Sequence, residues 1–66
     1  MHVKLNGKSA TVIESATLGA LVDMFVADRR GVAVAVNGQV VTRSQWDSQT
    51  LNNDDSIEVL SIAAGG

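Results

Sequence analysis

Gly65 and Gly66 stand at the end of the sequence. Glycine has no side chain to clash inside a narrow channel, and it reaches backbone conformations closed to other residues. Ala63 and Ala64 extend this slim section. A carboxylate on such a stalk could be threaded into the active site of another enzyme as the reacting group. The competing interpretation is a frayed end or a cloning remnant, so the fold that carries the tail has to decide between them.

The remaining polar residues do not predict an enzyme site. None of the serines has a base nearby in the sequence, and His2, the only histidine, lies on the polar side of a predicted strand. Asp54 and Asp55 could form a carboxylate pair, but the cluster Asn52-Asn53-Asp54-Asp55 is typical of a solvated turn. No basic or metal-binding residue lies near it in the sequence. We therefore expect a chain that is not an enzyme by itself.

The composition narrows the class of protein. The 66 residues suffice for one domain but leave little room for an enclosed substrate pocket. The absence of cysteine excludes disulfides and thiolate zinc sites, so apolar packing has to hold the fold, and 45% of the residues are hydrophobic. With a formal charge of −2, the chain lacks the excess of basic residues that nucleic-acid binding needs.

The sequence also lacks the usual membrane signals. No apolar run approaches the roughly 20 residues that span a bilayer. The first residues contain no signal-peptide core. We therefore expect a cytoplasmic protein with no membrane or nucleic-acid partner, monomeric when free.

Hydrophobic periodicity predicts a hairpin and then one helix. Val3 and Leu5 alternate with polar residues, and Asn6-Gly7 is the strongest short hairpin signal because both turn positions need a positive φ. Ala10 and Val12, with Ile13 as a candidate continuation, read as the return strand. Thr17 is the expected N-cap of a helix of about three turns. The apolar stripe of this helix consists of Leu18, Leu21, Val22, Phe25 and Val26.

Two features qualify this helix. Gly19 lies inside it and weakens it by about 1 kcal/mol relative to alanine. The segment from Asp28 to Gly31 is its predicted end, because cations near the C-terminal pole of the helix dipole and a following glycine are typical of helix ends.

A second hairpin follows the helix. Val32 to Val36 read as a strand with its valines toward the core, Asn37-Gly38 as the turn, and Gln39 to Val41 as a short partner strand. The segment 42–51 shows no clean period and is expected to hold a short helical turn around Ser44 to Trp46.

The last strand, from Ile57 to Ile62, has to pair with something already formed, and the middle of the sheet beside the first strand is the simplest place. A helix with one apolar stripe has to cover one face of that sheet. This arrangement is the ubiquitin-like β-grasp, an α+β fold with a mixed sheet of about five strands and one main helix across one face. We expect one domain over 1–62 and a flexible tail over 63–66.

Trp46 is the only tryptophan. We favour a packing role at the edge of the core over a role as an interface anchor. Arg29, Arg30 and Arg43 could contact partners, although surface arginines are mostly solvated cations.

Three stretches of the sequence carry a family resemblance. They are Val3 to Gly7, the block from Val34 to Trp46 with its Asn-Gly hairpin followed by Val, Arg and Trp, and Asp55 to Leu60 with the ending Ala64-Gly65-Gly66. Together they cover nearly the whole chain and resemble the ubiquitin-like sulfur carriers, most closely the ThiS family of thiamine biosynthesis. Thr42 departs from that family, which commonly has proline there.

The resemblance implies a role for the tail. An activating enzyme of the ThiF type would use ATP and magnesium to adenylate the carboxylate of Gly66, with Gly65 supplying clearance. Sulfur from a persulfide donor such as a cysteine desulfurase would replace AMP and leave a thiocarboxylate. A thiazole synthase of the ThiG type would receive that sulfur. The chain itself would hold no cofactor or metal and would be a protein co-substrate; without cysteine, Gly66 is the one place where it could carry sulfur.

A docking face follows from the period of the last strand. Ile57 and Val59 share one face, and Glu58, Leu60 and Ile62 share the other. The outward residues of the neighbouring strand add small apolar side chains. We expect a shallow apolar docking face made of Ala33, Ala35, Leu60 and Ile62, continuing into Ala63 and Ala64. A shift of one residue in either strand would reverse this assignment, and the alternative is a surface of scattered apolar residues.

Three other functions remain open at this point. A carrier for another pathway, such as the MoaD-like carriers of molybdopterin synthesis, shares the fold and the tail. A ubiquitin-like modifier of lysines would use the same adenylate. A plain interaction module would have its final glycines by accident.

Overall fold

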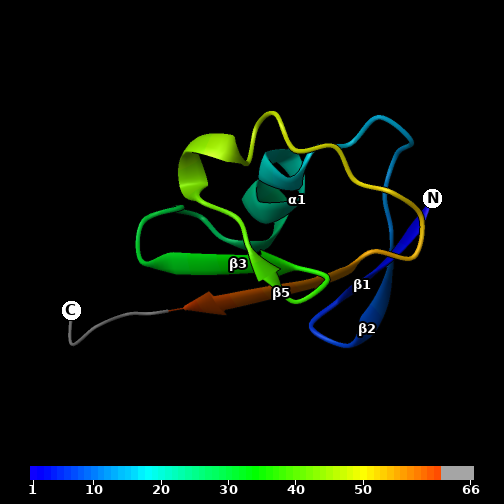
Figure 1. Ribbon diagram of the computed structural model, residues 1–66, viewed down its shortest axis with the longest axis horizontal. Coiled ribbons are helices and arrows are strands. Elements are labelled where there is room, and N and C mark those ends of the chain that lie inside the picture. Colours follow the sequence, from blue (N-terminus) through cyan, green and yellow to red (C-terminus); the bar gives the residue numbers. More distant parts are fainter. Residues whose placement is uncertain (62–66) are drawn as a thin grey trace.

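The computed structural model describes residues 1–61, in which one helix lies across one face of a five-stranded sheet (Figure 1). The elements in chain order are β1 (His2–Leu5), β2 (Lys8–Thr11), α1 (Leu18–Phe25), β3 (Val32–Val36), β4 (Gln39–Val40), the 3-10 helix η1 (Arg43–Gln45) and β5 (Ser56–Ser61).

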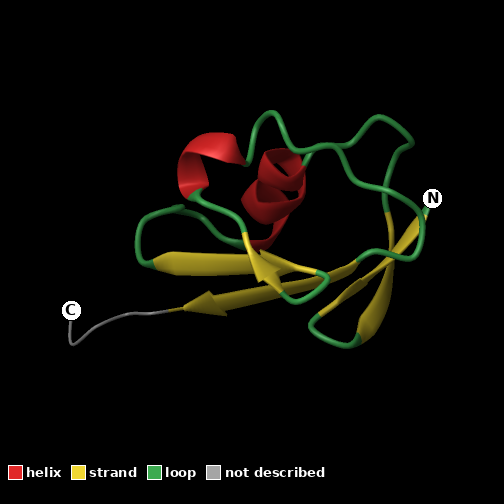
Figure 2. Cartoon of the chain, in the orientation of Figure 1, coloured by secondary structure: helices red, strands yellow, loops and turns green. Residues whose placement is uncertain are grey.

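β5 lies in the middle of the sheet, whose strand order is β2-β1-β5-β3-β4. It pairs in parallel with β1 and antiparallel with β3 (Figure 2). The predicted α+β fold, with a mixed sheet and one main helix, is therefore confirmed. The predicted domain boundary between 62 and 63 lies outside the described residues. Within residues 1–61, no helix is long and apolar enough to cross a membrane.

Both Asn-Gly pairs form the predicted hairpin turns. Asn6 and Gly7 have φ values of 50° and 83°, and Asn37 and Gly38 have 51° and 84°. Positive φ at both central positions gives a turn whose twist matches that of the flanking strands. The two turns join β1 to β2 and β3 to β4.

The start of α1 is capped as predicted. The hydroxyl of Thr17 accepts the backbone N–H of Ala20 at 3.1 Å. The first two helical N–H groups find partners in the segment after η1, since Leu18 donates to the carbonyl of Gln49 at 2.8 Å and Gly19 to that of Trp46 at 2.9 Å. These bonds satisfy donors that every helix leaves open at its N-terminus. They also fix the irregular 42–51 segment against the helix.

The end of α1 comes earlier than predicted. The helix has 8 residues, about two turns, and Val26 is already extended with φ −129°. The expected end at Asp28 to Gly31 is wrong, because the Asp28 carboxylate accepts the backbone N–H of Arg30 at 2.9 Å, a local bond that competes with helix formation. Phe25, predicted to lie in the apolar stripe, is the last residue of α1 and is 52% exposed.

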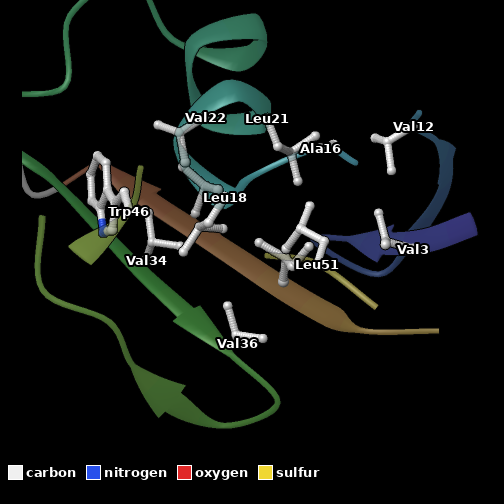
Figure 3. Packing of buried hydrophobic residues seen from close by; sticks show 12 residues of the cluster. Val3, Val12, Ala16, Leu18, Leu21, Val22, Val34, Val36, Trp46 and Leu51 are labelled. Atoms are coloured by element: carbon white, nitrogen blue, oxygen red, sulfur yellow. The ribbon is translucent and has the colours of Figure 1, made fainter. Parts of the chain in front are cut away.

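The core lies between α1 and the sheet (Figure 3). Leu18, Leu21 and Val22 of the helix are buried, as the period predicted, and face the buried side chains of β3 and β5. The buried hydrophobic residues of the described part are Val3, Val12, Ala16, Leu18, Leu21, Val22, Val34, Val36, Trp46, Leu51, Ile57 and Val59. Apolar packing therefore holds the fold without disulfides.

The structure explains why glycine occupies position 19 despite its low helix propensity. A Cβ atom at this position would clash with the carboxylate of Asp47 and would lie 2.8 Å from Nη2 of Arg29. The missing side chain therefore lets these two charged groups lie directly over the first turn of α1.

Arg29 ties the helix to the segment that follows η1. It donates to Asp23 at 2.8 Å through both Nε and Nη2, and to Asp47 at 2.8 and 3.1 Å. Its guanidinium also lies 5.7 Å from the ring centroid of Trp46, within the range of a cation–π contact. The hydrogen bonds from Arg29 hold the pKa of Asp23 and of Asp47 below the usual carboxyl value. The pairs thus stay ionised at neutral pH and lose their attraction as the pH falls through the carboxyl range.

Candidate functional site

The outward face of the sheet carries an apolar area beside the end of β5. In the β3–β5 register Ala33 lies opposite Leu60 and Ala35 opposite Glu58. Leu60 is 61% exposed, while its neighbour Val59 is buried under α1. The predicted split of β5 into a core face and an outward face is therefore confirmed for the described residues. Ala33 and Ala35 are half-buried between these strands.

Val40 belongs to the same face and was missed by the sequence analysis. It lies opposite Ala35 in the β3–β4 register, so both side chains point to one side of the sheet. It is 77% exposed. The signal that could have found it is the Asn37-Gly38 turn, because a two-residue turn fixes which residues of its two strands are paired. We call Ala33, Ala35, Val40 and Leu60 the outward patch.

The other half of the outward face is polar. Lys4 lies opposite Ser9, and His2 opposite Thr11, in the β1–β2 register. His2 is exposed, as predicted, with Nδ1 3.3 Å from the Thr11 hydroxyl. Among the described residues of this face, the apolar side chains therefore gather on the β4, β3 and C-terminal β5 side.

Asp55 anchors the start of β5 and is not the solvated residue that the turn cluster predicted. It is 8% exposed. Its carboxylate accepts the side-chain amide of Asn37 at 2.9 Å and the backbone N–H of Asn52 at 2.8 Å, which replace water. Asn37 in turn accepts the backbone N–H of Ser56 at 2.9 Å. Asp54 is exposed with φ 71° and fits the predicted turn.

Trp46 packs inside the molecule, as favoured over the interface role. Its side chain is 1% exposed, and its indole N–H donates to the carbonyl of Val41 at 2.8 Å. Of the three arginines considered for partner contacts, Arg29 is held as described above. Arg30 is paired with Asp28 at 2.8 Å, and Arg43 is exposed.

The tail residues named in the sequence analysis, Ile62, Ala63, Ala64, Gly65 and Gly66, lie outside the described residues. The structure shows where the chain leaves the sheet: Ser61, the last residue of β5, lies opposite Val32 at the start of β3. Among residues 1–61, no group of three or more His, Asp or Glu side chains could hold a metal ion.

A family model with the description "ThiS family" matches residues 3–66. The chain belongs to the ThiS family. The sulfur carrier protein ThiS of Escherichia coli (strain K12) is 27% identical over 66 residues, with both chains covered completely. A crystal structure of a thiamine biosynthesis protein (ThiS) from Geobacter metallireducens has a TM-score of 0.85 at 35% identity, again over all of both chains. A solution NMR structure of a thiamine biosynthesis protein from that organism has a TM-score of 0.80 at 35% identity, covering 100% of this chain and 88% of that one.

A longer protein also contains a ThiS-like segment. The thiazole synthase of Paramagnetospirillum magneticum (strain ATCC 700264 / AMB-1) is 30% identical over 66 residues, which are all of this chain but 20% of that protein. Taken together, the family match and the likeness over full length make this ThiS-family chain a sulfur carrier of thiamine biosynthesis with the ubiquitin-like β-grasp fold. Among the carriers that the sequence left open, the thiamine carrier is the one that the comparisons support.

Proposed function

We propose that the carboxylate of Gly66 is the group that carries the sulfur. A ThiF-like enzyme would use ATP and magnesium to form the acyl-adenylate, releasing pyrophosphate. The terminal sulfur of a persulfide, supplied by a cysteine desulfurase, then attacks the acyl carbon, and AMP leaves. A second thiol cleaves the remaining S–S bond by disulfide exchange and frees the thiocarboxylate. In this scheme the chain binds no cofactor of its own. Because the reaction uses ATP, we propose that it takes place in the cytoplasm.

The outward patch is the observation that supports this proposal best. Leu60 is exposed beside Ala33 on the strand that leads to the tail, so an enzyme that docks there would receive residues 62–66 at its active site. Exposed apolar patches on small soluble proteins commonly mark interaction sites. The absence of cysteine adds a chemical argument, because the chain has no thiol that could hold sulfur or attack its own thiocarboxylate.

We propose a ThiG-like thiazole synthase as the acceptor of the sulfur. The thiazole synthase of Paramagnetospirillum magneticum carries a segment similar to this chain within its own length, which supports a carrier and a synthase acting together.

The mass of the intact carrier tests the proposed function. After incubation with ATP, a ThiF-like enzyme and a cysteine desulfurase with cysteine, we expect the mass to rise by the difference between one sulfur and one oxygen. Adducts on lysines of other proteins would instead indicate a ubiquitin-like modifier. As a control, the same enzyme is shown to activate its own carrier in parallel. An unchanged mass of this chain would then contradict the proposal and favour a plain interaction module.

Leu60→Glu tests the docking role of the outward patch. A carboxylate in place of this apolar side chain would have to be desolvated on docking, so we expect kcat/KM for thiocarboxylation to fall about tenfold or more. Because Leu60 is exposed, the free energy of unfolding should change by less than about 0.5 kcal/mol. Met24→Glu is the matched control, since Met24 is 79% exposed on α1, which covers the opposite face of the sheet. Equal rates for the two variants would show that the patch is not the docking face.

A further inference from the structure

Asn6 hydrogen-bonds to β5 through its side chain as well as through its backbone. Its backbone N–H donates to the carbonyl of Ile57 at 2.8 Å. Its side-chain Oδ1 accepts the backbone N–H of Val59 at 2.8 Å, and its Nδ2 donates to the carbonyl of Val59 at 3.3 Å. One turn residue therefore contacts two successive positions on the same edge of the central strand.

These contacts extend the sheet past the end of β1. The pairing register of β1 with β5 comprises Lys4 with Ser56 and Leu5 with Ile57. The chain then turns into β2, while β5 continues past the hairpin (Figure 1). The Asn6 side chain offers Val59 one acceptor and one donor, as the backbone of a longer β1 would have done. It thereby supplies one further pair of ladder bonds without a strand.

Beyond Val59 the described part of β5 is paired on its other edge. Leu60 lies opposite Ala33 and Ser61 opposite Val32 in the β3–β5 register. Asn6 therefore holds the β1 side of the strand next to the outward patch and just before the tail. Removal of its amide would leave the last described residues of β5 held on one edge, by β3.

We propose that Asn6 is a positioning residue for the sulfur-carrying tail, which it directs by clamping Val59 on the edge of β5. This inference rests on the proposed function of Gly66. With the clamp in place, Val59 is bonded on both sides, to Asn6 and through the β3 pairing, before an activating enzyme binds. Without the clamp, the end of β5 frays and has to be ordered during binding.

We expect the loss of the Asn6 contacts to weaken binding of the carrier to the activating enzyme and to leave the rate of the chemical step nearly unchanged. Fixing the backbone of one additional residue lowers the population of the competent conformer between about 5- and 30-fold. We therefore expect Asn6→Gly to lower kcat/KM of adenylation by that factor, mainly through a higher KM. The kcat at saturating carrier should change less than about twofold, since the reacting carboxylate is the same.

The second Asn-Gly turn provides a matched control. Asn37 has a φ of 51°, and its side chain also bonds at β5, but at the opposite end of the strand, to Ser56 and to the buried Asp55. Glycine tolerates the positive φ of both turns, so Asn6→Gly and Asn37→Gly each remove an amide without adding turn strain. Asn6→Asp keeps an acceptor for the Val59 N–H and is expected to recover part of the lost kcat/KM.

The experiment measures adenylation kinetics, urea unfolding and amide hydrogen exchange on the full chain and the three variants. The proposal is supported if Asn6→Gly raises KM and speeds exchange at the Val59 amide, while Asn37→Gly speeds exchange at Ser56 and leaves KM within about twofold. It is overturned if both glycine variants have the same KM, or if KM follows stability alone. The mass of the wild-type chain tests the proposed function separately. If the wild type forms no thiocarboxylate, it is the proposed function of Gly66 that is contradicted.

Discussion

Deletion of Gly66 is expected to abolish thiocarboxylate formation while the domain stays folded. The shortened chain would still end in a carboxylate, now at Gly65, but that carboxylate would fall about 3.5 Å short of the enzyme's reacting phosphate. Bond formation requires the reacting atoms to approach to about 3–3.5 Å in the right orientation, so a shortfall of this size removes the productive geometry. Intact mass spectrometry after the full reaction is the measurement, and we expect less than about 1% conversion in the time that the wild type takes to complete.

Stability is expected to be unaffected by this deletion. The buried hydrophobic residues of the described part lie between Val3 and Val59, and β5 ends at Ser61. Urea unfolding should therefore give a free energy within about 0.5 kcal/mol of the wild type.

Gly66→Ala separates reach from clearance. It keeps the carboxylate in place and adds one methyl group, so it should retain more activity than the deletion. Conversion of the deleted chain at a tenth of the wild-type rate or faster would contradict Gly66 as the sulfur-carrying residue.

The parts of the fold that the sequence predicted correctly depend on short-range rules. The turns at Asn6 and Asn37 were predictable because type I′ turns need positive φ, which Asn-Gly supplies at both positions. The faces of β5 followed from strict alternation, so that Ile57 was assigned to the core and Leu60 to the surface. The central position of β5 followed from taking the simplest place for a final strand, beside the first strand in the middle of the sheet.

The parts that sequence reasoning missed depend on partners far along the chain. Asn6 and Val59 are separated by 53 positions, and Asn37 and Ser56 by 19, so no local pattern announces that a turn residue also clamps β5. The burial of Asp55 has the same origin, because its carboxylate bonds to an amide from the other hairpin.

The helix shows a similar limit. The clearance at Gly19 exists for Asp47 and Arg29, which tertiary packing brings over the helix. Phe25, the last residue of this helix, is exposed, although the period alone placed it in the stripe. The proposed role of the tail has another basis, because it rests on family membership and on the chemistry of the Gly66 carboxylate.

Trp46→Ala is expected to cost about 3–5 kcal/mol of the free energy of unfolding, the range for removing a large buried aromatic side chain. Trp46 is among the largest fully buried side chains of the described part, and its loss would leave a cavity between α1 and β3 (Figure 3). It would also remove the bond to the Val41 carbonyl and the surface on which Arg29 lies. A domain of 66 residues has roughly 3–10 kcal/mol of stability in total, so the substitution should remove a large share of it.

Urea unfolding followed by far-ultraviolet circular dichroism is the right measurement, because Trp46 is the only tryptophan and its fluorescence disappears with the substitution. Trp46→Phe is the control: it keeps an aromatic ring in the core but leaves the Val41 carbonyl without its donor, which should cost about 1–3 kcal/mol. A loss below 1 kcal/mol for Trp46→Ala, combined with weaker binding to the activating enzyme, would contradict the packing role and favour an interface anchor. We expect the reverse, with thiocarboxylation per folded molecule unchanged at low temperature, since the outward patch lies on the face of the sheet opposite the core that Trp46 fills.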